Sequence, residues 1–268
     1  MTLILSWLTP SFVMQASDRR LATAGWVFKD TQVKSVILSC KSGGAMFSCC
    51  GLGLLEGGPT DWWLTNVLTD AKLYNFDLRY VADFVRVRLT DAIRSLPGED
   101  GDRRCSFAIA AFVNGHPYAG LISNWEDLTG RETKAAADRA EVYWDDCSDR
   151  ADTPQFVVHH AFGMHAAVLD LDFLPHANQF PSAEDLCLHA GDMMPEAHES
   201  PLSCGFVGPD CLVTWITPAG ANAECRHYHA GKIPAITAPH FVSDFISVYD
   251  FRVSTTREGN RYEGPLPD

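Results

Sequence analysis

The chain has 268 residues, of which 46% are hydrophobic and 21% charged, which is typical of a globular protein with a buried core. Its formal net charge is −13 and no stripe of Lys and Arg is present, which argues against a nucleic-acid partner. No apolar run approaches the roughly 20 residues that a membrane span needs, so no membrane partner is expected either.

Nine cysteines are present, and we expect them to be free thiols in the reducing cytoplasm. Their number is odd, and no CxxC pair indicates a thiolate zinc site. The apolar start of the chain, MTLILSWLTPSFVMQAS, has no basic residue before Arg19 and is interrupted by Pro10. A secretory signal begins with a basic segment, so we expect strands here instead of an export signal.

The first part of the chain is predicted to form four strands. Residues 2–9 and 11–17 are apolar runs separated by a Pro-Ser turn, the pattern of a hairpin. Residues 33–39 and 45–50 form the third and fourth strands on either side of a Ser-Gly-Gly turn.

Two helices and a second hairpin are predicted next. A helix begins at residues 59–61, and residues 77–96 have apolar side chains three and four positions apart, typical of an amphipathic helix. Residues 105–113 and 117–123 flank Asn-Gly-His, a hairpin signal. The apolar face of the first helix is formed by Trp62, Trp63, Val67 and Leu68.

The second half of the chain has weaker patterns. Its predicted elements are a short helix over 134–144 within a polar stretch, one or two strands over 156–172, mostly loop over 174–205, a hairpin of 211–217 with 223–229, a strand over 241–254 and a mobile tail over 252–268. Runs of apolar strands around paired helices predict one α/β domain over residues 1–268, with two stacked sheets covered by helices.

Thr2 is the first candidate for chemistry. Removal of the initiator Met, which a small second residue permits, leaves Thr2 with a free α-amine beside its hydroxyl. Such an amine has a reference pKa of about 7.7–8.0 and can act as a general base. One residue then supplies both nucleophile and base.

Asp18 and Lys34 are the candidate partners of Thr2. Lys34 lies 32 positions after Thr2 in the third predicted strand, and Asp18 lies 16 positions from each, where the second strand ends. We expect Asp18 to pair with Lys34 and to hold its positive charge beside Thr2. The N–H of Gly51 can reach an oxyanion because no side chain is in the way.

This segment resembles the β-type subunits of the 20S proteasome and its bacterial relatives, which are N-terminal-nucleophile hydrolases. The matching residues are Thr2, 17–25 (SDRRLATAG), 31–36 (TQVKSV) and the apolar strand that ends at Gly51-Leu52-Gly53. The resemblance covers about residues 2–125. It implies a four-layer αββα sandwich, with two antiparallel sheets between helical layers.

The resemblance also implies a role for each matching residue. Thr2 is the nucleophile, Lys34 supplies positive charge to it, and Asp18 is the partner of Lys34. The N–H of Gly51 receives the oxyanion, with Gly53 as the alternative register.

Residues 126–250 depart from the family pattern. The family has an acidic residue, two others and then Ser-Gly-Gly at the end of the third helix, where they support the N-terminus. The nearest match is 199–210 (ESPLSCGFVGPD), in which Ser203 takes the place of the serine. Glu199 lies one position too far from Ser203, and Gly205 and Gly208 match only loosely.

The expected function is therefore hydrolysis of amide bonds, in peptides or small amides, without a cofactor or metal. The resemblance implies a homo-oligomer. Two alternatives stay open: an inactive binding or scaffold subunit of the same fold, which the divergent second half favours, and a small-molecule amidase of the same superfamily.

The histidines offer a competing metal hypothesis. His227 and His229 lie two apart on a predicted strand and so share a face, where they can act with His165 as ligands. His159 and His160 lie in the same apolar segment as His165. No HExxH or Cys-pair spacing supports a metal site, so ordinary core or surface histidines are the preferred interpretation.

Overall fold

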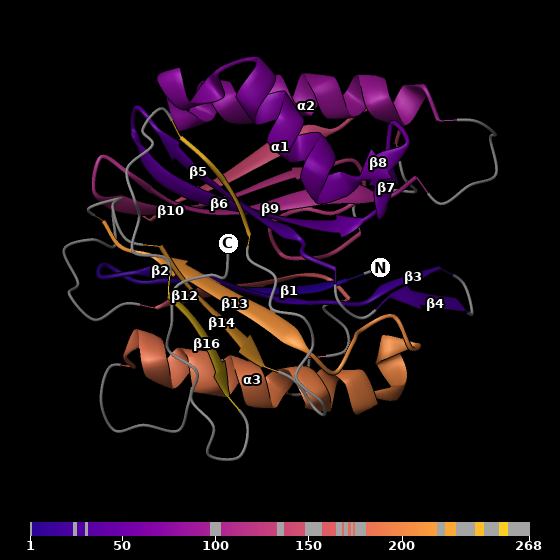
Figure 1. The fold of residues 1–268 in the computed structure, drawn as a ribbon, viewed down its shortest axis with the longest axis vertical. Helices are drawn as coiled ribbons and strands as arrows, with labels where there is room; N and C mark the ends of the chain where they lie inside the picture. The colour runs from indigo at the N-terminus through magenta and orange to yellow at the C-terminus, as the bar shows by residue number, and fades with distance from the viewer. Residues whose placement is uncertain are drawn as a thin grey trace.

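The computed structural model describes residues 2–23, 26–29, 32–96, 103–132, 137–147, 157–164, 168, 171–172, 174, 181–218, 223–228, 239–243 and 252–256. Within these ranges the chain forms three α-helices, two six-stranded sheets and two short two-stranded sheets (Figure 1). The fold is mixed α/β, as the sequence predicted. No helix in the described ranges has both the length and the hydropathy to cross a membrane.

The first six-stranded sheet contains the predicted N-terminal hairpin. Its neighbouring strands are antiparallel, except for the last two, which are parallel. In spatial order the strands are β12 (Val158–Gly163), β1 (Leu3–Leu8), β2 (Val13–Asp18), β13 (Cys211–Ile216), β14 (Ala223–Tyr228) and β16 (Arg252–Thr256).

The second six-stranded sheet contains the predicted third and fourth strands and the second hairpin. It too is antiparallel apart from one parallel pair at its edge, β5 with β15. In spatial order the strands are β11 (Glu141–Asp146), β10 (His116–Ser123), β9 (Cys105–Val113), β6 (Gly43–Gly51), β5 (Ser35–Cys40) and β15 (His240–Val242).

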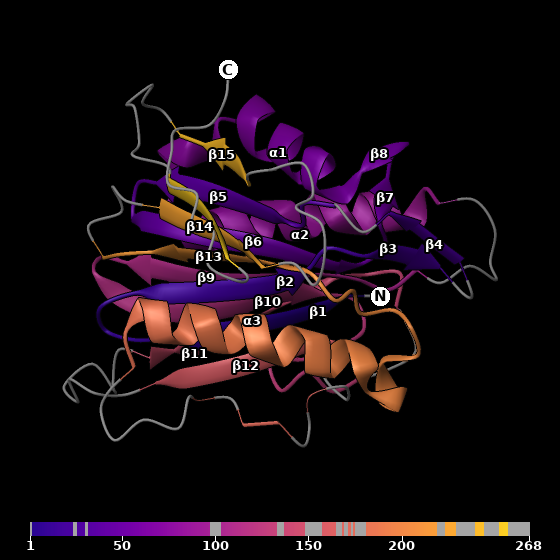
Figure 2. The same ribbon diagram turned by 60° about the horizontal axis from the view of Figure 1, so that its bottom comes forward.

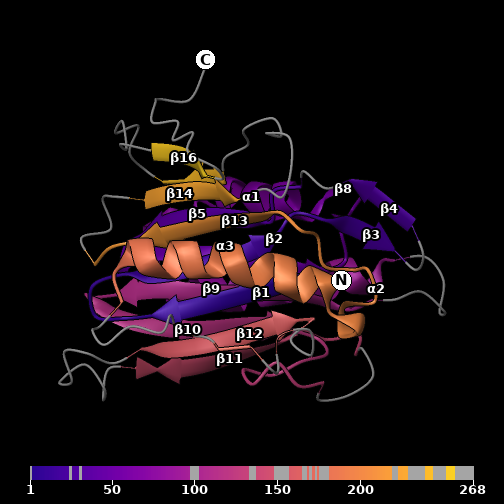
Figure 3. The same cartoon turned by 90° about the horizontal axis from the view of Figure 1, so that it is seen from below.

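The helices lie on the outer faces of these sheets. Helices α1 (Thr60–Asp70) and α2 (Leu78–Arg94) cover the second sheet, and α3 (Ala183–Glu199) covers the first (Figure 1). Turning the molecule shows α3 lying across β13, β2 and β1 (Figures 2 and 3). Two short hairpins, β3 (Leu21–Thr23) with β4 (Trp26–Lys29) and β7 (Leu54–Leu55) with β8 (Gly58–Pro59), were not predicted.

The alternation of side chains along β1 shows why both faces of the first sheet are apolar. Leu3, Leu5 and Trp7 pack with α3, whereas Ile4 and Leu8 point to the second sheet. Each sheet is therefore covered on both faces, which is what nearly continuous apolar strands indicate.

Between the apolar clusters of Ile4 and Leu8 the two sheets meet through buried polar side chains. The Gln15 amide donates to the hydroxyl of Ser6 (3.2 Å) and to the carbonyl of Ala108 (3.1 Å). Its oxygen accepts from Ser48 (2.9 Å), which also bonds Ser35 (2.8 Å). These contacts connect β1 and β2 to β5, β6 and β9, so they fix how the sheets lie on one another.

The prediction that residues 174–205 are mostly loop is wrong, because α3 occupies residues 183–199. Its start is a capping box, in which Ser182 and Asp185 each bond the other's backbone N–H. Gly191 and Pro195 interrupt its apolar pattern, and this obscured the helix in the sequence. Packing of its apolar face on the first sheet outweighs those two unfavourable residues.

Four further predictions need correction. The short helix over 134–144 is wrong from residue 141, because β11 pairs there with β10. The strand over 241–254 appears as two strands, β15 and β16, with 244–251 outside the described residues. The tail predicted from residue 252 begins with β16, and residues 257–268 lie outside the described ranges. Trp62 is 55% exposed and does not join the apolar face of α1.

Of the cysteines whose side chains the structure describes, none forms a disulfide and most are buried.

Candidate active site

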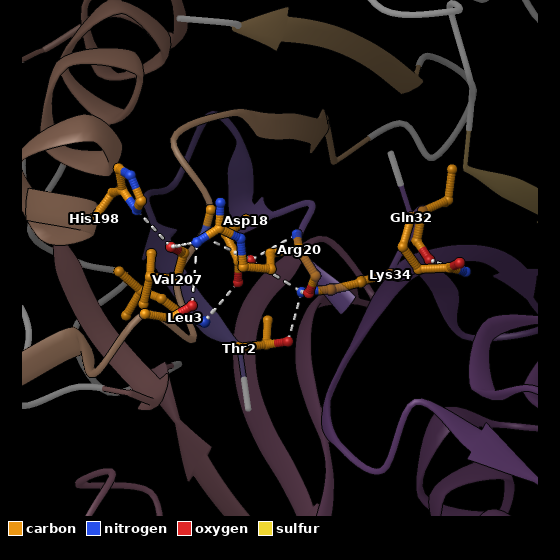
Figure 4. Close-up of polar contacts among 11 residues, drawn as sticks. Thr2, Leu3, Asp18, Arg20, Gln32, Lys34, His198 and Val207 are labelled. Atoms are coloured by element: carbon orange, nitrogen blue, oxygen red, sulfur yellow. Dashed lines mark hydrogen bonds and ion pairs between the residues drawn. The ribbon is translucent and has the colours of Figure 1, made fainter. Parts of the chain in front are cut away.

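Thr2, Asp18 and Lys34 meet where the ends of the two large sheets approach each other (Figure 4). Thr2 directly precedes β1, and the antiparallel pairing of β1 with β2 brings it next to Asp18, the last residue of β2. Lys34 directly precedes β5 of the other sheet. All three side chains are buried, with exposures of 4%, 0% and 4%.

The ammonium of Lys34 makes three hydrogen bonds. It donates to Thr2 Oγ1 (2.6 Å), to Asp18 Oδ1 (3.1 Å) and to the carbonyl of Arg20 (2.6 Å). An ammonium has three N–H donors and no acceptor, so this set occupies it fully. In this arrangement Lys34 can supply positive charge to the Thr2 oxygen, and it has no lone pair with which to take a proton.

The carboxylate of Asp18 is held by four donors. Oδ2 accepts from the N–H of Leu3 (2.8 Å), and Oδ1 accepts from the N–H groups of Arg20 (2.8 Å) and Gly208 (3.2 Å) and from Lys34. A buried ion pair is stable only when further hydrogen bonds satisfy its atoms, and these backbone donors do so. The Leu3 contact also fixes the strand residue next to Thr2.

The backbone of Thr2 is held on its other side by β12. The N–H of Met164 donates to the Thr2 carbonyl (2.9 Å). Gly163, with φ +75°, lies so close that a Cβ on it would stand 2.1 Å from the same carbonyl oxygen. Only glycine fits at this position, because it has no side chain and adopts positive φ without strain.

Gly51 lies on the cleft that Thr2 and Lys34 line, as the sequence predicted. The N–H of Cys49 donates to the Lys34 carbonyl (2.8 Å), and residues two apart in a strand direct their N–H groups to the same side. Cys49 therefore faces Lys34 with its backbone, and Gly51 ends the same strand two residues later. Gly51 has φ +92°, and a Cβ on it would meet the Arg104 carbonyl at 2.0 Å.

The remaining wall of the cleft is lined by both polar and apolar residues. Asp61 is its one further carboxylate among the described lining residues, and it accepts from Gln32 (2.8 Å) and from His240 (3.2 Å). The other lining residues are Arg20, Leu21, Cys49, Cys50, Leu52, Gly53 and Thr60.

Ser203 is not brought into this site. Its hydroxyl donates to the carbonyl of His198 (3.0 Å) and accepts from the N–H of Gly205 (3.3 Å), so it closes the turn after α3. The same segment reaches the site through backbone groups instead. The N–H of Gly208 binds Asp18, and the carbonyl of Val207 accepts from Arg20 (3.4 Å) and His198 (2.8 Å) (Figure 4).

The metal hypothesis gains no support from the residues that the structure describes. No group of three or more His, Cys, Asp or Glu side chains among them can hold an ion. The ring of His160 bonds the Leu128 carbonyl (3.0 Å). His165 and His229 lie outside the described residues.

Sequence reasoning missed three contributors to the site. The Arg20 carbonyl and the Gly208 N–H are backbone groups, and no residue type signals them. Glu126 is a fully buried carboxyl that bonds Cys50 and Gly163, and both of these residues adjoin the site. An acidic residue three positions after the end of the apolar run 117–123 was the available signal for it.

No protein-family model matches this sequence, and a search of curated proteins found no match to it. The link to the proteasomal β subunits is therefore a resemblance of residues and spacing.

Proposed function

We propose that this chain is an N-terminal threonine hydrolase that cleaves amide bonds in peptides. The observation that carries the proposal is the 2.6 Å contact between the Lys34 ammonium and the Thr2 hydroxyl, at the side of Asp18. A buried ammonium beside a hydroxyl favours the alkoxide-like oxygen that attacks a carbonyl.

The reaction requires removal of Met1, which lies outside the described residues. The Thr2 α-amine then takes the hydroxyl proton, directly or through a water, as the oxygen attacks the substrate carbonyl. Lys34 does not act as the base, since its three donors are engaged.

The tetrahedral oxyanion is stabilised by the N–H of Gly51. Collapse of this intermediate breaks the amide bond. The leaving amine departs with the proton from the α-amine, and an ester remains on Thr2. Water, deprotonated by the same amine, then cleaves the ester and regenerates the hydroxyl.

The arrangement of layers is consistent with this proposal. We infer that the helices α1 and α2, the two sheets and α3 correspond to the four layers of an N-terminal-nucleophile hydrolase. The homo-oligomer rests on the resemblance alone, and sedimentation of the purified protein tests it.

Labelling with a peptide β-lactone or epoxyketone tests the function. Intact mass should show loss of Met1 and one covalent adduct, and peptide mapping should place the adduct on Thr2. Thr2→Ala is the matched control and should give no adduct.

The inactive-scaffold alternative is favoured by one observation, the position of Ser203 away from Thr2. A mature chain that retains Met1, or a free Thr2 that gives no adduct at any pH, would support that alternative and refute the hydrolase. Adducts on Thr2 combined with turnover of acylated metabolites, but not of peptides, would indicate the small-molecule amidase.

A further inference from the structure

The carboxyl of Glu126 lies at the junction of the two strands that hold opposite sides of the site. Oε1 accepts from the Cys50 thiol (3.3 Å), and Oε2 accepts from the Gly163 N–H (2.9 Å). Cys50 immediately precedes Gly51, whose N–H is the oxyanion donor of the proposed function. Gly163 precedes Met164, whose N–H holds the Thr2 carbonyl.

These contacts place one side chain between the nucleophile and the oxyanion donor. Gly163 also lies close to both sides, because a Cβ on it would stand 2.1 Å from the Thr2 carbonyl oxygen and 3.4 Å from Cys50 Cβ. A movement of Glu126 would therefore shift Gly163 against Thr2, and Cys50 with Gly51. Displacements of about 1 Å at reacting atoms cost up to about a hundredfold in rate.

We propose that ionised Glu126 is a positioning residue, which fixes the distance between the Thr2 hydroxyl and the Gly51 N–H through Gly163 and Cys50. This inference rests on the proposed hydrolase function. Glu126 is fully buried and does not line the cleft, so it does not touch the substrate.

The ionisation state matters because a carboxylate accepts from both donors. When protonated, one oxygen carries a hydrogen and becomes a donor toward the Cys50 sulfur or the Ser106 hydroxyl, so it accepts less strongly than in the carboxylate and the contacts around it rearrange. An amide at this position has the same pattern, one acceptor and one donor group. Glu126→Gln therefore mimics the protonated side chain at every pH.

Of Glu126 and the thiols beside it, only Glu126 changes its protonation state in the working pH range. Burial raises the pKa of Glu126 to about 7, so it titrates in the working range. Burial raises the pKa of Cys50 and Cys105 well above the usual value, so both remain neutral thiols there. Among the residues that the structure describes, the charged neighbours are Asp127, which is next in the chain, and Glu132, whose backbone forms a β-bridge with Glu126 and whose side chain pairs with Arg104.

The test measures the rate and concentration dependence of Thr2 labelling by a peptide β-lactone, for wild type and Glu126→Gln, from pH 5.5 to 8.5. Glu126→Gln should label about tenfold more slowly at pH 8.5, with the half-saturating concentration unchanged. Below pH 6 the two rates should converge. The ratio of the two rates at each pH reports the effect of the substitution. Glu132→Gln, which removes an exposed carboxyl nearby, should label like wild type.

Three outcomes would overturn the inference. They are equal rates at every pH, a rate ratio that does not vary with pH, and a change in half-saturation alone, which indicates a role in binding. Thermal unfolding of each variant shows whether a slower labelling rate results from partial unfolding of the protein. If the wild-type protein is never labelled, the proposed hydrolase function is refuted, and this inference with it. If the wild type is labelled and Glu126→Gln is labelled equally fast, only the proposed role of Glu126 is refuted.

Discussion

At the scale of single residues, the site depends on satisfying a buried charge pair. Lys34 and Asp18 have almost no exposure, and each is surrounded by hydrogen-bond partners that replace water. Removing one partner leaves the other charged and unpaired, which costs more than the pair itself contributes. Comparing single and double substitutions of these two residues therefore separates their effect on the free energy of unfolding from their effect on the labelling of Thr2.

Lys34→Met should destabilise the protein by about 3–5 kcal/mol, because Asp18 is left buried without its cation. Thr2 labelling should fall by a factor of about 100 or more, since the positive charge beside the hydroxyl is lost. Urea unfolding and labelling rates measure the two effects.

The double variant Asp18→Asn with Lys34→Met is the control for charge burial. It should regain part of the stability, because neither charge is then unpaired, and it should still fail to label. A Lys34→Met protein that labels at the wild-type rate would contradict the proposed role of Lys34.

Glu126→Gln should also change how stability depends on pH. The folded-state pKa of about 7 lies above the ordinary value of 4.5, so the folded state binds the proton more tightly. The contribution of Glu126 to stability is therefore fully present below pH 4.5 and is lost as pH rises through about 7. The loss is on the order of 3 kcal/mol and is absent in the variant.

Urea unfolding at pH 4.5 and 7.5 measures this difference. Relative to wild type, Glu126→Gln should become more stable as pH rises, while its labelling becomes slower. A variant that loses stability together with rate at pH 8 would show that Glu126 has a structural role only.

At the scale of the elements, the polar contacts between the sheets set their alignment. Apolar clusters on either side of Gln15 contribute burial, which is not directional, whereas the bonds of Gln15 with Ser6, Ser48 and Ala108 are directional. Thr2 and Lys34 belong to different sheets, so this alignment also determines whether they meet.

Gln15→Ala should lower the free energy of unfolding by about 2–4 kcal/mol, because it leaves a cavity and unpaired polar groups. Gln15→Met keeps most of the volume and removes the hydrogen bonds, and should cost about 1–3 kcal/mol. Chemical denaturation measures both. An unchanged stability for Gln15→Ala would show that the polar layer does not hold the sheets.

At the scale of the whole molecule, the start of the chain lies at a meeting point of segments distant in sequence. Thr2 contacts Lys34, which directly precedes β5 of the second sheet (Figure 4). It also contacts Met164, directly after β12, and Asp18 beside it binds Gly208 beyond α3. The proposed chemistry also needs a free α-amine at this point.

An uncleavable extension placed before Thr2 should abolish labelling, because it converts the basic amine into an amide. The same extension at the C-terminus is the matched control and should leave the labelling rate unchanged. Circular dichroism should show the same fold for both. Labelling of the N-terminally extended protein would refute the amine as the base.

Much of the fold could be read from local patterns. The strands on either side of the Ser-Gly-Gly turn and the hairpin around Asn-Gly-His were predicted from periodicity and turn residues, which are local signals. The helix predicted over 77–96 is likewise found, as α2 over 78–94. Helix α3 was missed because its stability comes from packing on β2 and β13, which no local pattern records.

The sequence by itself determined that Thr2, Asp18 and Lys34 occur at a suggestive spacing, and that Gly51 ends the fourth strand. Only the tertiary structure decided that these residues meet, that Ser203 bonds elsewhere, and that Glu126 joins the two sides of the site. The reason is physical: strand periodicity depends on neighbouring residues, whereas a contact across two sheets depends on how both sheets pack.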